Sequence, residues 1–167
     1  GSERESQDKD IPPELKYADF GDVTGIVFDQ QEGVWIDSLS PNYALEYYAL
    51  SGELKMLLGD NQTTVVDGFT GYRWSGGQKD GDFENFSFRS PRNVLMGSNP
   101  NYLFVSDNDH LTTLRLVDLE EKQVSTVPGV TGFGKIFISP DDEMYMVRGR
   151  AIYRIEPSPV KVLTLGE

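Results

Sequence analysis

The same order of short apolar segments occurs three times along the chain. Each copy has three segments rich in β-branched and aromatic residues, separated by turn-forming residues, and a fourth apolar segment closes it. Segments with this composition and these boundaries are typical of β-strands joined by tight turns. The copies span residues 24–59, 91–129 and 134–166, and their closing segments are residues 56–59, 125–129 and 162–166. We therefore expect an all-β chain of small antiparallel sheets, with the closing segment as the last strand of each sheet.

The spacing of a large aromatic residue aligns the three copies. It lies nine, ten and nine positions after an apolar residue of the first segment, in the pairs Ile26 and Trp35, Val94 and Phe104, and Ile136 and Tyr145. We expect Trp35, Phe104 and Tyr145 to be buried at equivalent positions. A repeat of about 40 residues with several short strands is the signature of a β-propeller blade. The predicted fold is therefore β-propeller-type, with about three antiparallel blades in a partial ring or half-propeller.

The domain organisation follows from composition. Residues 1–13 are polar and charged without periodicity, and we expect a disordered leader or tag there. Residues 14–167 are expected to form the blades, at about 20–60, 88–130 and 131–167, with a long insertion at 60–90 that is rich in Gly and aromatic residues. Three blades leave apolar sheet faces uncovered. We therefore expect either a portion of a larger propeller or a homo-oligomer that completes a ring.

Charge and composition restrict the possible partners. The net charge of −12 argues against a nucleic-acid backbone or an anionic membrane as a partner. Cysteine is absent, which excludes disulfides, thiol catalysis and cysteine-based zinc sites. No segment approaches the roughly 20 apolar residues of a membrane helix, so no membrane insertion is expected. The sequence does not determine the localisation, although an extracellular or cell-envelope location is favoured over the cytoplasm.

The central part of the chain resembles a blade of the NHL-repeat family. Residues 77–81 read Gly-Gln-Lys-Asp-Gly, Phe88 precedes Pro91 by three positions, residues 104–110 read Phe-Val-Ser-Asp-Asn-Asp-His, and residues 124–127 read Val-Ser-Thr-Val. The resemblance covers about residues 77–129 and is weaker in the flanking copies, where Ser38 and Arg148 stand at the position of Asp107. It implies a propeller of six or a similar number of blades, in a family whose members mostly bind proteins, RNA or glycans.

One cluster in the insertion is a candidate recognition site. Tyr72, Arg73 and Trp74 stand together among glycines, and aromatic residues and arginine are enriched at binding hot spots. His110, the single histidine, is expected to be a structural turn residue that tethers neighbouring blades, as the resemblance implies. Residues 80–82 and 107–109 are rich in aspartate but do not follow the spacing of a calcium loop. We therefore predict no catalytic residue, no metal site and no cofactor.

Three functions are compatible with these features. The first is a non-enzymatic binding or scaffold module that uses a propeller surface to bind a protein or glycan partner. The second is a fragment of a calcium-dependent propeller hydrolase of the lactonase type. That interpretation is disfavoured because one histidine is available and no glutamate-centred cluster recurs in register. The third is a bacterial surface accessory protein of glycan uptake, with the segment around Trp74 as its site.

Overall fold

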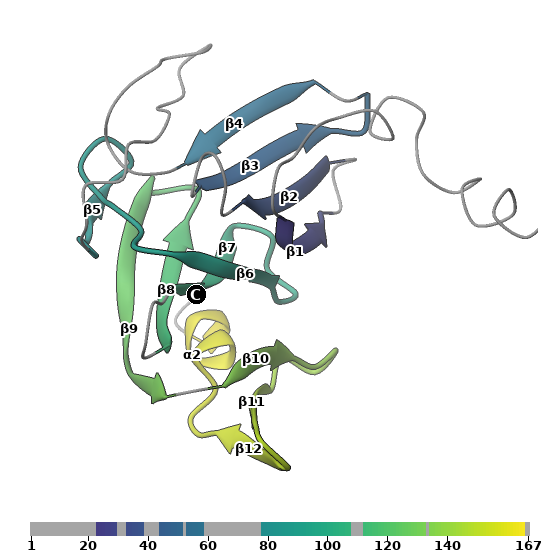
Figure 1. Cartoon of the computed structure of the whole chain (residues 1–167), viewed down its shortest axis with the longest axis vertical. Coiled ribbons are helices and arrows are strands. Elements are labelled where there is room, and N and C mark those ends of the chain that lie inside the picture. Colours follow the sequence, from purple (N-terminus) through teal and green to yellow (C-terminus); the bar gives the residue numbers. More distant parts are fainter. Residues whose placement is uncertain are drawn as a thin grey trace, which may run out of the picture.

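The residues that the structure describes fold into three antiparallel β-sheets that follow one another in sequence order (Figure 1). The computed structural model describes residues 23–29, 33–38, 44–51, 53–58, 78–107, 112–132 and 134–165. Figure 1 shows the first sheet at the top, the second in the middle and the third at the bottom. The predicted all-β class with about three antiparallel sheets is therefore confirmed. The predicted leader at 1–13 lies outside the described residues.

The first sheet is a four-stranded meander. Its strands are β1 (Val23–Phe28), β2 (Gly33–Ser38), β3 (Ala44–Ala49) and β4 (Leu54–Leu58), in the order β1-β2-β3-β4. Because side chains alternate along a strand, the sheet has two distinct faces. Trp35 and Leu45 pack toward the second sheet, whereas Val34 and Ile36 lie on the opposite face with Tyr48. The first copy of the repeat is thus a sheet that is apolar on both sides.

The second sheet has five strands in the order β5-β9-β8-β7-β6. They are β5 (Gly81–Asp82), β6 (Pro91–Met96), β7 (Tyr102–Asp107), β8 (Thr112–Asp118) and β9 (Gln123–Gly132). The two-residue strand β5 pairs only with Gln123 and Val124, at the start of β9. Since β5 and β6 lie at opposite edges, the segment between them crosses the sheet, and it buries Phe86 and Phe88 in the core shared with the first sheet.

The third sheet differs from the prediction. It contains only β10 (Lys135–Ile138), β11 (Met144–Arg148) and β12 (Ala151–Ile155) among the described residues. Residues 162–165, expected as a closing strand, belong instead to the short helix α2 (Pro159–Leu165). Figure 1 shows α2 between the second and third sheets. No helix in the described part of the chain is long and apolar enough to cross a membrane.

Local chemistry explains why α2 forms where a strand was expected. Pro159 occupies the first helical position, where its missing N–H costs nothing and its fixed φ angle suits the helix. The carbonyl of Ser158 accepts the N–H of Val162 at 3.1 Å, and the Ser158 hydroxyl donates to the carbonyl of Asp142 at 2.6 Å. Val160 and Leu163 then pack into the core between the second and third sheets. The apolar residues that suggested a strand are therefore buried by a helix.

The strand registers confirm the alignment of the three copies. The residue pairs Val27 and Trp35, Leu95 and Phe104, and Phe137 and Tyr145 occupy the same register position in their sheets. Trp35 and Phe104 are buried as expected, with exposures of 3% and 1%. Tyr145 is only half-buried, so that part of the prediction is wrong. The reason is geometric: Trp35 packs against the second sheet and Phe104 against the third, whereas Tyr145 lies on the face of the third sheet that points away from the second.

Candidate binding surface

The residues chosen from the sequence as a recognition site are not placed by the structure. Tyr72, Arg73 and Trp74 lie outside the described residues, and so does His110. Their roles therefore remain predictions. The described chain resumes at Gln78, four residues after Trp74 in the sequence, and from there it can be followed in detail.

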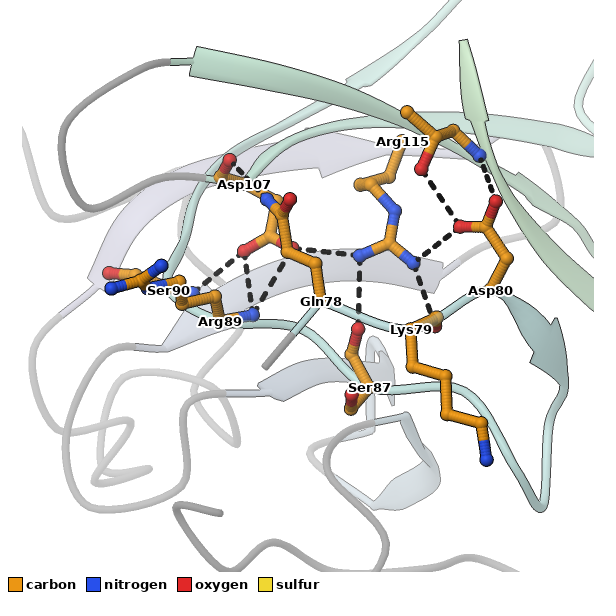
Figure 2. A network of polar contacts seen from close by, with 9 residues as sticks. Gln78, Lys79, Asp80, Ser87, Arg89, Ser90, Asp107 and Arg115 are labelled. Carbon is orange, nitrogen blue, oxygen red and sulfur yellow. Dashed lines mark hydrogen bonds and ion pairs between the residues drawn. The ribbon is translucent and has the colours of Figure 1, made fainter. Parts of the chain in front are cut away.

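A buried arginine fixes the segment that follows Gln78. Arg115 of β8 is completely buried, and both of its terminal nitrogens are engaged (Figure 2). Nη1 donates to the carboxylate of Asp107 at 2.8 Å and to the carbonyl of Ser87 at 3.0 Å. Nη2 donates to the carbonyl of Lys79 at 2.9 Å and to the carboxylate of Asp80 at 3.0 Å. One guanidinium group therefore ties together strand β7, the crossing segment at Ser87 and the residues Lys79 and Asp80, which precede β5.

Asp107 completes the network from the other side. Its carboxylate accepts the backbone N–H groups of Arg89 and Ser90, the latter at 2.7 Å, and its carbonyl accepts Nε2 of Gln78 at 2.9 Å (Figure 2). A buried carboxylate is tolerated when a cation and hydrogen-bond donors compensate its lost hydration, and here both are present. Asp80 and Asp107, which the sequence placed in two aspartate-rich segments, are thus brought together by Arg115.

Asp80 also blocks the edge of the second sheet. Its carboxylate accepts the backbone N–H of Thr126 at 3.1 Å and the Thr126 hydroxyl at 2.8 Å. Thr126 follows the two residues of β9 that pair with β5. An unpaired N–H at a strand edge is a potential site for pairing with another chain. The side chain of Asp80 therefore caps the edge of β9 where the backbone pairing with β5 ends.

Sequence reasoning did not identify Arg115, although one signal was present. The run 114–117 reads Leu-Arg-Leu-Val inside a strand, so alternation places Arg115 on the same face as Val117, which is buried. A charged residue at an inward-facing position indicates a buried partner. The guanidinium also lies 5.5 Å from the centre of the Phe88 ring, a favourable cation–π distance. The partners themselves come from distant segments, which the local pattern could not reveal.

The described surface contains an apolar cleft between β9 and α2, called here the β9–α2 cleft. Its volume is about 460 Å³. The apolar side chains on its walls include Phe104, Leu116, Val127, Val130, Val162 and Leu163. Polar side chains are few: Ser125, Thr126 and Glu156 also contribute to the lining. Thr126 is bonded to Asp80 and Glu156 is paired with Arg154, so the cleft offers mainly apolar contacts.

A carboxyl group with a raised pKa lies in the first sheet. Asp37 of β2 is completely buried and accepts a hydrogen bond from the hydroxyl of Thr24 through Oδ2, while Oδ1 has no partner. Burial raises the pKa of Asp37 to about 6, and the hydrogen bond from Thr24 only partly opposes this effect. Perturbed groups often mark reactive sites. Asp37, however, has no exposed surface through which a substrate could reach it.

Asp37 faces the junction of the first and second sheets. A Cβ atom placed on Gly25 would lie 2.4 Å from Oδ1 of Asp37 and 2.8 Å from Oδ1 of Asn93, so both oxygens surround this glycine. Asn93 of β6 in turn donates through Nδ2 to the carbonyl of Ile136, in the third sheet, at 3.3 Å. Polar groups from all three sheets therefore approach one another near β1, β6 and β10.

No group of three or more His, Cys, Asp or Glu side chains in the described ranges is arranged to hold a metal ion. Comparison with known proteins adds little about function. No protein-family model matches the chain, and no curated protein matches it. Among solved structures, it is similar to a structural genomics protein of unknown function from Bacteroides thetaiotaomicron VPI-5482, with a TM-score of 0.43 and 13% sequence identity. That similarity covers 80% of this chain and 47% of the other, so this chain spans about half the length of that protein.

Proposed function

We propose that the chain is a non-enzymatic binding module that holds an apolar side chain of a protein partner in the β9–α2 cleft. The observation that carries this proposal is the cleft itself, about 460 Å³ in volume and lined mainly by apolar side chains. This volume is within the range of clefts that bind ligands in proteins. Val162 on its wall is 51% exposed, so a partner could reach the cleft without rearrangement of the fold.

The lining favours a protein over a glycan as the occupant of this cleft. Sugars present many hydroxyl groups, each of which loses its hydration on binding unless a hydrogen-bond partner replaces the water. Thr126 and Glu156 are already engaged with Asp80 and Arg154. An apolar side chain needs no such partners, and the buried centres of protein interfaces are apolar. A side chain such as Leu, Met or Phe therefore fits the chemistry of the cleft.

The segment around Trp74 is proposed as a second recognition element. Tyr72, Arg73 and Trp74 have the composition of a binding hot spot, and Trp and Tyr rings can also stack on sugars. What supports the proposal is the anchoring of residues 78–80, which follow closely in the sequence, by Arg115 and Asp107. A fixed attachment point reduces the conformational entropy that a neighbouring segment loses when it binds a partner. A glycan partner would be recognised here.

The hydrolase alternative has no support in the described residues. Asp37 has a raised pKa but is sealed from solvent. Asp80 and Asp107 both form ion pairs with Arg115. General acid–base catalysis requires a group within hydrogen-bond reach of a substrate. The binding function is therefore the one that the described geometry supports best.

A displayed library of random peptides is the direct test. We expect enriched peptides to share an apolar anchor residue, and Val162→Asp to weaken their binding at least about tenfold, because the new carboxylate would lose its hydration inside the cleft. Tyr153→Asp is the matched control, since Tyr153 is 54% exposed and does not line the cleft. Peptides that bind Val162→Asp as well as the parent chain would disprove the role of the cleft. Trp74→Ala, tested on the same peptides and on a glycan array, separates the contribution of the segment around Trp74.

A further inference from the structure

In the described part of the chain, the third sheet has one strand fewer than the repeat predicts. In the first sheet β4 pairs with β3, and in the second sheet β9 pairs with β8, the strand equivalent to β3. The equivalent strand of the third sheet is β12, which pairs with β11 on one side and with no described strand on the other (Figure 1). Residues 162–165, expected as its neighbour, lie in α2. β12 is therefore an edge strand at a position that is covered in the other two sheets.

Equivalent register positions show that this edge is open. Glu46 of β3, Arg115 of β8 and Tyr153 of β12 occupy the same register position in their sheets. Glu46 and Arg115 are 2% and 0% exposed, whereas Tyr153 is 54% exposed. Ile152, which lies on the opposite face of the third sheet, is 71% exposed. Side chains on both faces of β12 are thus uncovered, as expected for a strand without a neighbour.

The turn before β12 determines which backbone groups face the open edge. A two-residue turn, with Gly149 at its first position at a φ of 58°, joins β11 to β12. Such a turn links the carbonyl of the residue before it to the N–H of the residue after it. Because hydrogen-bonded pairs alternate along an antiparallel ladder, Ala151 and Tyr153 direct their backbone groups toward β11. Ile152 and Arg154 therefore direct theirs toward the open edge, where an extended segment of another chain can pair with them.

Charge at this edge favours an acidic partner. Residues 144–155 contain no carboxylate and three arginines, Arg148, Arg150 and Arg154, in a chain with a net charge of −12. Arg154 also pairs with Glu156, but both side chains remain more than half exposed. Antiparallel pairing of β12 with β12 of a second copy would bring two sets of these arginines together, so charge disfavours that arrangement. An acidic segment of another protein would place carboxylates beside the arginines instead.

We propose that the open edge of β12 pairs with an extended acidic segment of a partner protein, which supplies the fourth strand of the third sheet. Main-chain hydrogen bonds with Ile152 and Arg154 provide the affinity, and carboxylates of the segment beside the arginines provide the selectivity. The exposed side chain of Ile152 contacts an apolar side chain of the segment. The wall of the β9–α2 cleft at Val162 takes no part, so the proposal stands or falls independently of the proposed function.

Amide hydrogen exchange followed by NMR tests this pairing directly. The probe is a peptide selected from a displayed library of about eight residues, enough for a strand of typical length. The library is built from β-branched, aromatic and acidic residues, and a matched library has lysine and arginine in place of the acidic residues. We expect binders from the acidic library only. In the free chain the N–H groups of Ile152 and Arg154 should exchange faster than that of Tyr153, and a bound peptide should slow both at least about tenfold.

Two variants separate the edge from the cleft. Ile152→Pro removes an N–H that faces the open edge and leaves the pairing with β11 in place, as proline on edge strands usually does. We expect it to weaken binding of the selected peptides at least about tenfold. Val162→Asp, on the wall of the β9–α2 cleft, is the matched control and should bind these peptides like the parent chain. If Ile152→Pro does not fold, N-methylation of alternate residues of the peptide removes the same hydrogen bonds from the other side.

Several results would overturn the proposal. They include an acidic library without binders, equal binding from both libraries, and a bound peptide that leaves the exchange of Ile152 and Arg154 unchanged. Slow exchange of these N–H groups in the free chain would show that the edge is already covered, by this chain if it is independent of concentration and by a second copy if it is not. Binding that is lost in Val162→Asp and kept in Ile152→Pro would place the peptides in the cleft, which would support the proposed function and refute the pairing at β12.

Discussion

Arg115 and Asp107 form an ion pair with both side chains fully buried, at an N–O distance of 2.8 Å. The pair lies between β7 and β8 and holds the segment that crosses from β5 to β6. Buried ion pairs contribute little net stability compared with apolar residues of the same size, because both charges lose their hydration. Removing one partner is different, since the other charge then remains buried without compensation. This asymmetry makes the network a sensitive test of the structure.

Asp107→Ala is expected to lower the free energy of unfolding by about 3–5 kcal/mol, the usual cost of leaving one buried charge without its partner. Urea-induced unfolding followed by circular dichroism measures this loss. Glu156→Ala is the matched control, because it breaks the exposed Arg154–Glu156 pair, in which both side chains are more than half exposed. Exposed pairs contribute little, so the control should unfold close to the parent chain. Equal urea midpoints for Asp107→Ala and the parent would contradict the buried network.

Phe104→Ala is expected to cost about 3–5 kcal/mol, because the ring fills the core between the second and third sheets and its removal leaves a cavity. Tyr145 provides a control at the same register position of the third sheet. Its side chain is only half-buried, so Tyr145→Ala should cost clearly less. Chemical denaturation of both variants in parallel gives the comparison. A larger loss of unfolding free energy for Tyr145→Ala than for Phe104→Ala would show that the outer face of the third sheet is more deeply buried than the second sheet's core side chain.

The repeat and the register could be predicted from the sequence because both depend on local alternation. Trp35 and Phe104 follow their partner segments at nearly constant spacing, and the strands pair as this spacing requires. The closing strand of the third sheet could not be predicted by the same reasoning. Residues 162–165 are apolar and suit a strand, but Ser158 and Pro159 start a helix just before them. The local helix start and the core contacts of Val160 override the expected repeat.

The candidate site was less accessible to sequence reasoning than the fold. The β9–α2 cleft exists because α2 packs beside β9. The sequence pattern predicted a strand in place of α2, so it could not predict this cleft. Arg115 contacts Lys79 and Asp80, which are more than 30 positions away, and no periodic pattern reports such a contact. Tyr72, Arg73 and Trp74 were chosen on composition alone, and their position in the fold remains a prediction.

The raised pKa of Asp37 predicts that part of the free energy of unfolding depends on pH. Its pKa is raised from 3.8 to about 6 by burial, so the folded chain binds this proton more tightly than the unfolded chain does. This contribution to the free energy of unfolding is therefore fully present below pH 3.8 and is lost as the pH rises to about 6. A shift of about two pKa units corresponds to a roughly 100-fold change in the unfolding equilibrium constant.

The structure indicates why the neutral form of Asp37 is preferred. Oδ1 of Asp37 has no partner, and the nearby side-chain oxygen of Asn93 can accept a hydrogen bond but cannot donate one. An ionised Oδ1 of Asp37 therefore has no hydrogen-bond donor to compensate its lost hydration, whereas a neutral carboxyl group needs less compensation. Asp37→Asn replaces the acid with a neutral group of the same shape that also donates. We therefore expect this variant to be more stable than the parent chain near neutral pH.

Urea unfolding of the parent chain and of Asp37→Asn between pH 4 and 8 measures this effect as a difference. The many other carboxylates contribute equally to both proteins and cancel, so the stability gain from Asp37→Asn should grow as the pH rises to about 6 and then level off. Glu46→Gln is the matched control, because Glu46 is also buried in the first sheet but pairs with the hydroxyl of Tyr48 on the opposite face. The free energy of unfolding of Glu46→Gln should therefore keep the pH-dependent loss that comes from Asp37, which Asp37→Asn removes. If Asp37→Asn does not fold, the carboxyl carbon of Asp37 can be followed by NMR in the parent chain, where a midpoint near the ordinary value of 3.8 would refute the prediction.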